Sequence, residues 1–295
     1  MRIAGLYVPL LTPLRADGSV ATEAIDGHVG RLLAAGVDGV VALGTTGEFA
    51  DLTGSERATV VAATVDAVAH RVPVLAGVGG IGTAEACAHA RAAADAGADG
   101  LLALPPLYWK LGEDGLVRHF LAVATATDLP TLLYDYPALA GTALLPALVR
   151  RIAEEAPDVV GIKLSGPELR AVHGVLSGAK TRDPGFSVMV GAADLAFPAL
   201  VAGADGMIAA LGNVAPEPLA ALHAAVRDGE LDQAARHHAR ILALLEIPAL
   251  STPPILALKA AARAAGSPLE PVVRTPPDDA DAVIRRATDR AGALL

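Results

Sequence analysis

The sequence predicts an α/β fold, a (β/α)8 TIM barrel followed by a C-terminal helical appendage. Eight short apolar segments occur along the chain, and most are continuous rather than alternating, as parallel strands buried on both faces are. Longer segments rich in Ala and Leu, of helical length, separate them. Strands that alternate with helices favour a parallel sheet, and eight such units favour a closed barrel.

The expected strands and helices follow one another in regular order. The strands cover residues 3–11, 36–43, 72–78, 100–104, 131–136, 159–163, 187–191 and 206–211. The helices between them cover residues 22–35, 54–70, 83–97, 114–127, 144–155, 167–178 and 193–202. Three of these helices end near an Ala-Gly pair, which is typical of a C-terminal cap because glycine tolerates a positive φ: Ala35-Gly36, Ala96-Gly97 and Ala202-Gly203.

The chain after residue 215 is expected to be helical throughout. Helices are predicted over residues 216–228, 230–246, 254–265 and 279–293. The first of them would close the barrel, and the others would form the appendage. We therefore expect a barrel that carries the catalytic site over residues 1–228 and a helical region over residues 229–295.

An open doubly wound sheet is the alternative fold. It is disfavoured because no Gly-x-Gly-x-x-Gly fingerprint follows the first strand. The segment from Gly77 to Gly82 has that spacing, but it follows the third strand, and a single match is weak. We expect this segment to be a loop whose glycines provide permissive backbone dihedrals.

Composition excludes several classes of function. The formal net charge is −9, and no basic run exceeds Arg150-Arg151 or Arg285-Arg286, so nucleic-acid binding through a basic patch is unsupported. The single Cys87 excludes an internal disulfide or a cysteine-rich zinc site. The adjacent His237 and His238 cannot face one metal from consecutive helical positions. With no signal-like or membrane-spanning run, we expect a soluble cytoplasmic protein without a metal, a cofactor or a membrane partner.

Lys163 is the most informative residue of the chain. It ends the apolar run Val159-Val160-Gly161-Ile162-Lys163, and it is one of only four lysines. A charged, unpaired lysine at the end of a buried strand costs several kcal/mol, and staying partly neutral avoids that cost. Since a neutral amine attacks ketones, Lys163 is a candidate Schiff-base lysine. The alternative is a lysine that extends to solvent or pairs with a carboxylate.

Other polar residues are expected beside Lys163 because the carboxyl ends of all barrel strands meet at one mouth. The second strand ends in Gly44-Thr45-Thr46-Gly47-Glu48, and the fifth ends in Tyr134-Asp135-Tyr136-Pro137. Hydroxyl groups of tyrosine and threonine can transfer protons. Backbone N–H groups of a Gly-Thr-Thr-Gly turn can bind a carboxylate. Thr45 and Thr46 could also be turn residues or the N-cap of the helix that starts near Ser55.

Three motifs resemble the dihydrodipicolinate synthase / N-acetylneuraminate lyase family, and in finer detail its 2-keto-3-deoxy sugar-acid aldolases. They are Gly44-Thr45-Thr46-Gly47-Glu48, Tyr134-x-x-Pro137 and Gly161-Ile162-Lys163, in the family's order and spacing. The similarity extends over nearly the whole chain, through Val8-Pro9, Thr12-Pro13, Asn213-Val214 and Pro253-Pro254-Ile255 up to Lys259. The resemblance implies a class I lyase that forms a Schiff base with a 2-oxo acid such as pyruvate. It also implies assembly into a homotetramer or dimer.

The resemblance also implies roles for single residues. Lys163 would form the imine, Tyr134 would be the general acid and base, and Thr45 would relay protons. Thr46 and the amide of Gly47 would bind the carboxylate of the 2-oxo acid, and Gly191 and Ile208 would line the pocket. Tyr108 matches a tyrosine that, in the synthases, reaches the site of a neighbouring subunit; a plain aromatic contact between subunits is the alternative.

Leu139 departs from the synthase pattern. The synthases have an arginine at this position that helps bind the carboxylate of aspartate semialdehyde, and leucine cannot replace its charge-assisted hydrogen bonds. Here Tyr134-x-Tyr136-Pro137 and Ala138-x-x-Gly141 look more like the sugar-acid aldolases. We therefore expect reversible aldol cleavage and condensation with pyruvate and an aldehyde, on a 2-keto-3-deoxy sugar acid or a 4-hydroxy-2-oxoglutarate type of substrate. Synthase activity, sugar-acid dehydration and mere 2-oxo acid binding remain alternatives.

Overall fold

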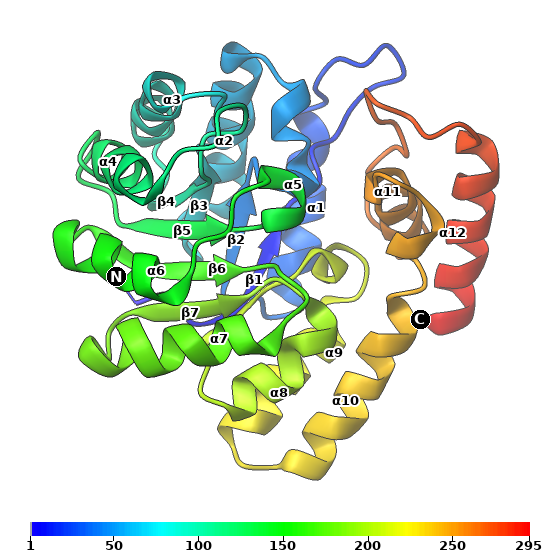
Figure 1. Ribbon diagram of the computed structural model, residues 1–295. Coiled ribbons are helices and arrows are strands. Elements are labelled where there is room, and N and C mark those ends of the chain that lie inside the picture. The colour runs from blue at the N-terminus through cyan, green and yellow to red at the C-terminus, as the bar shows by residue number, and fades with distance from the viewer. Residues whose placement is uncertain (1) are drawn as a thin grey trace.

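Eight parallel strands close into a barrel in the order β1 to β8 in the computed structural model, which describes residues 2–295 (Figure 1). This architecture confirms the fold predicted from the sequence. The strands are β1 (Gly5–Pro9), β2 (Gly39–Ala42), β3 (Val74–Gly77), β4 (Gly100–Ala103), β5 (Thr131–Asp135), β6 (Val159–Leu164), β7 (Ser187–Val190) and β8 (Gly206–Ile208).

Helices surround the barrel, and each lies within a few residues of its predicted position. They are α1 (Glu23–Ala34), α2 (Gly54–Val68), α3 (Thr83–Asp95), α4 (Glu113–Ala124), α6 (Pro146–Glu155), α7 (Leu169–Val175), α8 (Ala196–Val201) and α9 (Pro216–Arg227). Two features were not predicted. A short helix α5 (Pro137–Ala140) follows β5, and α7 continues as a π-helical turn from Leu176 to Lys180.

The strands are buried because helices cover their outer face and the opposite face fills the barrel. Nearly every strand residue is buried, which explains why the apolar runs in the sequence are continuous rather than alternating. One hydrophobic cluster joins β3 to β7 with the helices around them. A second joins β1 and β8 to α1, α9, α10 and α11, so the C-terminal helices share a core with the barrel.

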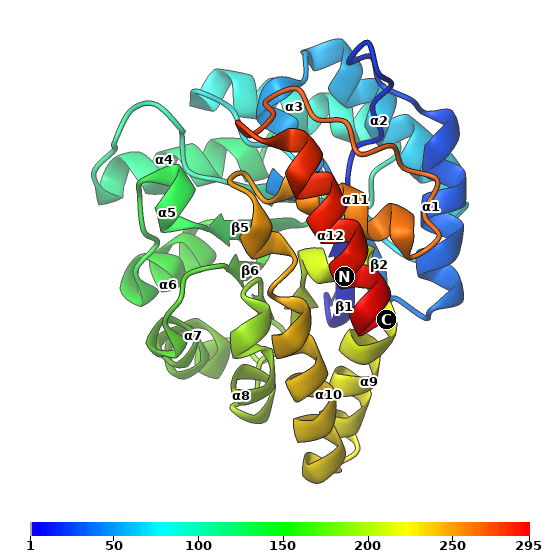
Figure 2. The same cartoon turned by 90° about the vertical axis from the view of Figure 1, so that its right-hand side faces the viewer.

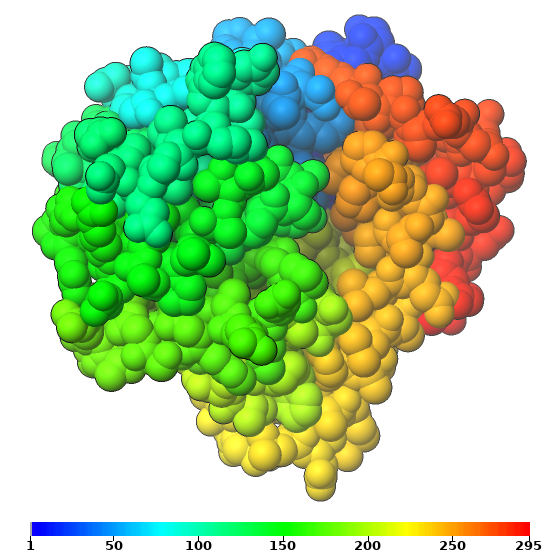
Figure 3. All heavy atoms as spheres, in the orientation of Figure 1, coloured from blue at the N-terminus to red at the C-terminus, as the bar shows by residue number. Residues whose placement is uncertain are grey.

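The chain after α9 forms the three predicted helices, α10 (Leu231–Leu244), α11 (Ile255–Ala264) and α12 (Ala280–Leu294). Seen from the side, α11 and α12 lie in front of the barrel (Figure 2). In the space-filling view, the orange and red C-terminal segment packs against the blue N-terminal part of the barrel (Figure 3). None of the helices between residues 2 and 295 combines the length and apolarity that crossing a bilayer requires.

The glycines confirm one expectation and correct another. Gly36, Gly97 and Gly203 have φ of 78°, 86° and 108°, as expected of residues that end helices in the left-handed region. The loop from Gly77 to Gly82 was expected to need permissive dihedrals, and this was wrong, because its glycines have no positive φ. Gly77 is required by close approach instead, since a Cβ there would lie 2.0 Å from the carbonyl oxygen of Leu43.

Candidate active site

Lys163 lies on β6, one residue before the strand ends, at the carboxyl end of the barrel. Val160 is half-buried, but the other strand residues, including Lys163, are buried, and Lys163 is only 4% exposed. In the register of the sheet Lys163 pairs with Tyr134 on β5. Two adjacent parallel strands thus bring the predicted lysine and tyrosine side by side.

The side chains of Lys163, Tyr134 and Thr45 form a connected group. Nζ of Lys163 lies 4.1 Å from the centroid of the Tyr134 ring, within the range of a cation–π contact. The hydroxyl of Tyr134 lies 3.3 Å from Oγ1 of Thr45, a distance at which either oxygen can donate a hydrogen bond. An amine and a phenol, both buried, therefore meet the hydroxyl of the half-buried Thr45, with a path for a proton from the phenol to Thr45.

Thr45, Thr46 and Gly47 form a tight 3-10 turn directly after β2. The N–H of Gly47 donates to the carbonyl of Gly44 at 2.9 Å, and Oγ1 of Thr12 donates to the carbonyl of Gly47 at 2.6 Å. A Cβ on Gly47 would lie only 3.0 Å from the carbonyl oxygen of Leu10, so this turn packs closely on the loop after β1. The turn is therefore rigidly held beside the lysine.

The predicted N-cap role of Thr45 and Thr46 was wrong. The N-cap of α2 is Thr53, whose N–H donates to Oε2 of Glu56 at 2.8 Å while Oγ1 accepts from the N–H of Glu56 at 3.3 Å. This reciprocal capping box satisfies the first turn of the helix. Thr45 and Thr46 therefore do not cap α2, and both lie in the 3-10 turn.

Gly191 and Ile208 have different surroundings. Gly191 follows β7 and lies beside Lys163, since a Cβ added there would lie 3.0 Å from Cε of Lys163 and 1.9 Å from Oγ of Ser165. Ile208 ends β8, is 1% exposed and is the register partner of Tyr7. Gly191 therefore joins the group around Lys163, whereas Ile208 has the burial and register of a barrel-packing residue.

Tyr108 does not join the buried group within one chain. It lies on the loop between β4 and α4 with its side chain 69% exposed, and its ring contacts that of Trp109 edge-to-face at 5.0 Å. The N–H of Leu107 donates to the carbonyl of Gly80 at 3.3 Å, so this loop lies beside the loop after β3. Both aromatic rings are presented to the outside of the chain.

Burial also changes the proton affinity of two groups next to Tyr134. Burial raises the pKa of Asp135, and the hydrogen bond from the N–H of Leu144 to Oδ1 at 2.9 Å opposes that rise. Burial, together with the proximity of Tyr134, raises the pKa of Tyr136. The carboxylate of Asp135 accepts a hydrogen bond from the segment after α5 and so holds that segment in place. Asp135 is not a hydrogen-bond partner of Lys163.

The sequence did not predict a buried ion pair between Glu48 and Lys259. Nζ of Lys259 donates to Oε1 of Glu48 at 2.5 Å, and the two side chains are 0% and 6% exposed. Glu48 directly follows the 3-10 turn, whereas Lys259 lies on α11. A signal for this pair was present, because Lys259 is the single charge in an otherwise apolar helical run from Ile255 to Ala262.

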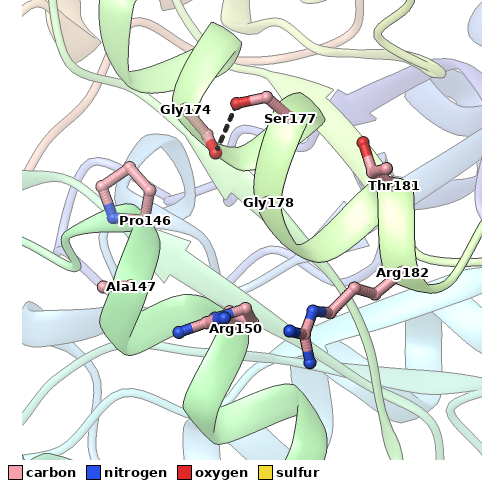
Figure 4. Close-up of a pocket in the computed structure, with 8 residues that line it drawn as sticks. All are labelled: Pro146, Ala147, Arg150, Gly174, Ser177, Gly178, Thr181 and Arg182. Carbon is pink, nitrogen blue, oxygen red and sulfur yellow. Dashed lines mark hydrogen bonds between the residues drawn. The ribbon is translucent and has the colours of Figure 1, made fainter.

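A pocket on the outer wall of the barrel lacks the groups that surround Lys163. It has a volume of about 360 Å³ and lies between α6 and the helical segment that ends at Arg182, with Arg150 and Arg182 along the same edge (Figure 4). NH1 of Arg182 is already bonded to Oε1 of Glu154 at 2.8 Å. Its hydroxyls, those of Ser177 and Thr181, donate to backbone carbonyls of their own helix, and no base or lysine lines the pocket, so it does not compete with Lys163 as a candidate active site.

Within residues 2–295 the structure contains no group of three or more His, Cys, Asp or Glu side chains that could hold a metal ion. The groups that meet at Lys163 are an amine, hydroxyls and backbone amides. Such groups suit an anionic carbonyl compound, since the amine can attack its carbonyl carbon and the amides can bind its carboxylate.

Comparison with known proteins gives consistent matches over the whole chain. The model of the "Dihydrodipicolinate synthetase family" matches residues 2–291. Escherichia coli K12 YagE, named "Putative 2-dehydro-3-deoxy-D-gluconate aldolase", is 36% identical over 94% of this chain and 92% of its own. The 4-hydroxy-tetrahydrodipicolinate synthase of Methanopyrus kandleri is 35% identical over 99% of this chain and 98% of its own.

The fold of a solved relative is also close. The crystal structure of E. coli YagE in complex with pyruvate has a TM-score of 0.95 and 34% sequence identity, and the match covers 99% of this chain and 98% of that one. The barrel and the C-terminal helices therefore occur together in both proteins.

Proposed function

The chain belongs to the dihydrodipicolinate synthetase family, and from this premise we propose that it is a class I lyase that acts on a 2-oxo acid through an imine on Lys163. The observation that carries the proposal is the position of Nζ of Lys163, 4.1 Å from the ring of Tyr134, whose hydroxyl lies 3.3 Å from Oγ1 of Thr45. A nucleophile, an acid–base group and a proton relay are the parts that imine chemistry requires.

The first step forms the imine. The neutral amine of Lys163 attacks C2 of the 2-oxo acid, and the carbinolamine loses its oxygen as water after Tyr134 provides a proton. Tyr134 is then a phenolate that accepts a hydrogen bond from the hydroxyl of Thr45. The product is a protonated imine, whose positive nitrogen withdraws electrons from C2.

The second step breaks the carbon–carbon bond. The hydroxyl on C4 gives its proton to Tyr134 while the C3–C4 bond breaks, so C4 leaves as an aldehyde and the electron pair forms an enamine with the lysine nitrogen. Tyr134 then gives this proton to C3 of the enamine. Water adds to the imine that results, pyruvate leaves, and the proton released returns to Tyr134 with Thr45 as the relay, so Lys163 is again a neutral amine. Condensation is the same sequence in reverse.

The 3-10 turn is proposed to bind the carboxylate of the 2-oxo acid. The backbone N–H and the hydroxyl of Thr46, after the end of β2, offer hydrogen-bond donors without a full positive charge, whereas the N–H of Gly47 already donates to the carbonyl of Gly44 at 2.9 Å and shapes the turn. Because the turn is tied to the loop after β1 by the bond from Thr12 to Gly47, these donors need little reorganisation when substrate binds. Gly191 leaves room for the Lys163 side chain, and Ile208 is proposed as apolar lining.

The substrate is proposed to be a 2-keto-3-deoxy sugar acid or a 4-hydroxy-2-oxoglutarate type of acid. Two observations support this class. Leu139 stands where the synthases have a carboxylate-binding arginine, and E. coli YagE, which carries the name of a 2-dehydro-3-deoxy-D-gluconate aldolase, is 36% identical. The matches to 4-hydroxy-tetrahydrodipicolinate synthases keep condensation with aspartate semialdehyde as the second candidate reaction.

Assembly into a homotetramer or dimer, in the cytoplasm, belongs to the same proposal. The exposed rings of Tyr108 and Trp109, 69% and 68% exposed, support a contact between subunits, because large aromatic side chains are enriched at interfaces. In such a contact Tyr108 would reach the site of the neighbouring subunit. A cytoplasmic location is consistent with the free Cys87, which has no partner for an internal disulfide.

Reductive trapping tests the imine directly. Borohydride is added to the protein with pyruvate, and the adduct is located by mass spectrometry of peptides. We expect a mass increase on Lys163 in the wild type, no adduct there in the folded variant Lys163→Ala, and unchanged trapping in the control Lys110→Ala. Turnover retained by Lys163→Ala, or no adduct from neutral to alkaline pH, would refute the mechanism and favour a protein that only binds 2-oxo acids.

A panel of substrates distinguishes the reactions. Pyruvate is measured with 2-keto-3-deoxy sugar acids, 4-hydroxy-2-oxoglutarate, N-acetylneuraminate and aspartate semialdehyde. Release of pyruvate from a sugar acid supports aldol cleavage, whereas loss of water from the same acid without pyruvate would indicate a dehydratase.

A further inference from the structure

Lys259 and Glu48 join the C-terminal helical region to the mouth of the barrel. Besides its bond to Glu48, Nζ of Lys259 donates to the carbonyl of Val272 at 2.6 Å, so the amine is fully buried and twice bonded. Burying two charges costs free energy that their attraction at best offsets, so an apolar pair of similar volume would hold these elements together equally well. Stability alone therefore does not account for an ion pair at this place.

Glu48 is the residue that closes the carboxylate-binding turn. Its N–H donates to the carbonyl of Thr45 at 3.1 Å, and its φ of 55° places it in the left-handed region, which is uncommon for a residue with a side chain. The turn is thus held at two points. Thr12 holds the carbonyl of Gly47, and Lys259 holds the side chain of Glu48.

Arg274 strengthens the same connection. Its N–H approaches Oε2 of Glu48 at 3.4 Å, and its guanidinium donates to the carbonyls of Gly18 and Asp51 and to Glu56 at the start of α2. The segment that connects α11 to α12 therefore contacts elements on both sides of the turn. Burial lowers the pKa of Lys259, and the adjacent carboxylate of Glu48 counteracts that effect.

We propose that Lys259 is a positioning residue for the reaction, because through Glu48 it fixes the Thr45-Thr46-Gly47 turn in the geometry that binds the substrate carboxylate. The inference rests on the proposed function, since it assigns the turn to carboxylate binding. The C-terminal helical region would then set the affinity for the 2-oxo acid, although it contributes no group that touches the substrate.

A second ion pair, between a half-buried lysine and a buried carboxylate, provides a control. Nζ of Lys180 lies 2.6 Å from Oδ2 of Asp205, whose side chain is 2% exposed. Asp205 directly precedes β8, so this pair lies at the amino end of the barrel, opposite the turn. A purely structural role predicts that loss of either lysine lowers the melting temperature and leaves substrate binding alone. A positioning role for Lys259 predicts that loss of Lys259 weakens substrate binding, whereas loss of Lys180 does not.

The test compares the variants Lys259→Met and Lys180→Met in the full-length protein. We expect Lys259→Met to raise KM for the 2-oxo acid about tenfold or more, the effect of one misplaced hydrogen-bonding turn, with a much smaller change in kcat. The pyruvate concentration that gives half-maximal trapping of Lys163 should rise in parallel. Lys180→Met should lower the melting temperature and leave both quantities near their wild-type values.

A double variant keeps the test decisive if Lys259→Met fails to fold. In Glu48→Gln with Lys259→Met both charges are removed, so the fold should recover while KM stays high. An unchanged KM in either folded variant would overturn the inference.

Hydrogen exchange separates this inference from the proposed function. The amides of Gly47 and Glu48, which are bonded within the turn, should exchange faster in Lys259→Met than in Lys180→Met. If wild-type Lys163 is not trapped by pyruvate, the proposed function fails, and the exchange rates still decide whether Lys259 fixes the turn. Equal exchange in the two variants would contradict the positioning role.

Discussion

The side chain of Lys163 lies beside Gly191, where a larger residue would crowd it. A Cβ on Gly191 would lie 3.0 Å from Cε of Lys163. The same Cβ would lie 1.9 Å from Oγ of Ser165, which is closer than any real contact. The space that the lysine occupies therefore depends on glycine at the end of β7, and the backbone there needs no positive φ.

The variant Gly191→Ala should therefore impair imine formation more than it impairs folding. Inserting a methyl group into a packed site costs about 1–3 kcal/mol of stability, and here the added group displaces the side chains of Lys163 and Ser165. Trapping with pyruvate and borohydride should be much slower in the folded variant. The control is Gly178→Ala, since a Cβ on Gly178 meets nothing within 4 Å. Wild-type trapping rates in Gly191→Ala would contradict the packing argument.

Tyr134→Phe separates the ring from its hydroxyl. The ring that faces Nζ of Lys163 is kept, but the hydrogen bond to Thr45 is lost, so the proton path is interrupted. We expect kcat for aldol cleavage to fall roughly 10²–10⁴-fold, the usual contribution of general acid–base catalysis. Tyr136→Phe is the matched control, because that neighbouring ring, 6.0 Å from Tyr134, lacks the bond to Thr45. Equal losses in the two variants would argue against Tyr134 as the acid–base group.

The barrel and the pair of Lys163 and Tyr134 could be predicted because both depend on local patterns. Continuous apolar runs identify strands buried on both faces, and parallel strands place their carboxyl ends at one mouth. That rule places Lys163 and Tyr134 at one mouth, and the register confirms that they are neighbours, whereas the role of Tyr134 was predicted from the family resemblance.

Contacts between distant segments could not be predicted in the same way. Glu48 and Lys259 are 211 positions apart, and no periodicity links them. The glycines at 77–82 suggested special dihedrals, but the requirement at Gly77 comes from the backbone of Leu43, the residue directly after the neighbouring strand β2. Thr45 has the same spacing to Glu48 as Thr53 has to Glu56, so the local signal does not distinguish the two threonines. The capping box forms at Thr53, whereas the carboxylate of Glu48 is bonded to Lys259.

The stability of the protein should fall as the pH drops from about 6.5 to about 4 because of His28. This histidine is 1% exposed, and its burial lowers its pKa to about 4. Nε2–H donates to Oδ1 of Asn213 at 2.9 Å, since that oxygen only accepts, and Nδ1 accepts from the hydroxyl of Ser267 at 2.9 Å. The native state therefore holds the neutral ring, whereas the unfolded chain binds a proton below pH 6.5.

Between these two pH values the unfolded state binds more protons than the native state, so acid favours unfolding. A shift of this size corresponds to about 3 kcal/mol, fully lost below pH 4. Urea unfolding at a series of pH values measures it. His28→Gln should flatten the slope in this window, whereas the exposed His173→Gln should retain it. Parallel slopes for all three proteins would show that another group controls acid unfolding.

The variant Leu139→Arg should increase synthase activity. Leu139 lies on the short helix α5 after β5, with its side chain 62% exposed, so a longer side chain can be accommodated without disturbing the core. An arginine there could form charge-assisted hydrogen bonds with the carboxylate of aspartate semialdehyde. One such interaction contributes about 1.5–3 kcal/mol, which corresponds to roughly 10–100-fold in kcat/KM.

Condensation of pyruvate with aspartate semialdehyde is measured for Leu139→Arg, the uncharged control Leu139→Gln and the wild type, together with cleavage of a 2-keto-3-deoxy sugar acid. The wild type should favour cleavage, and only the arginine variant should gain condensation. Lys110 is a cation that contacts this helix, but its Nζ is bonded to the carbonyl of Ala140 at 2.7 Å and does not substitute for an arginine at position 139. Strong condensation by the wild type would show that Lys110 or another group already binds the second carboxylate, and would favour the synthase as the natural reaction.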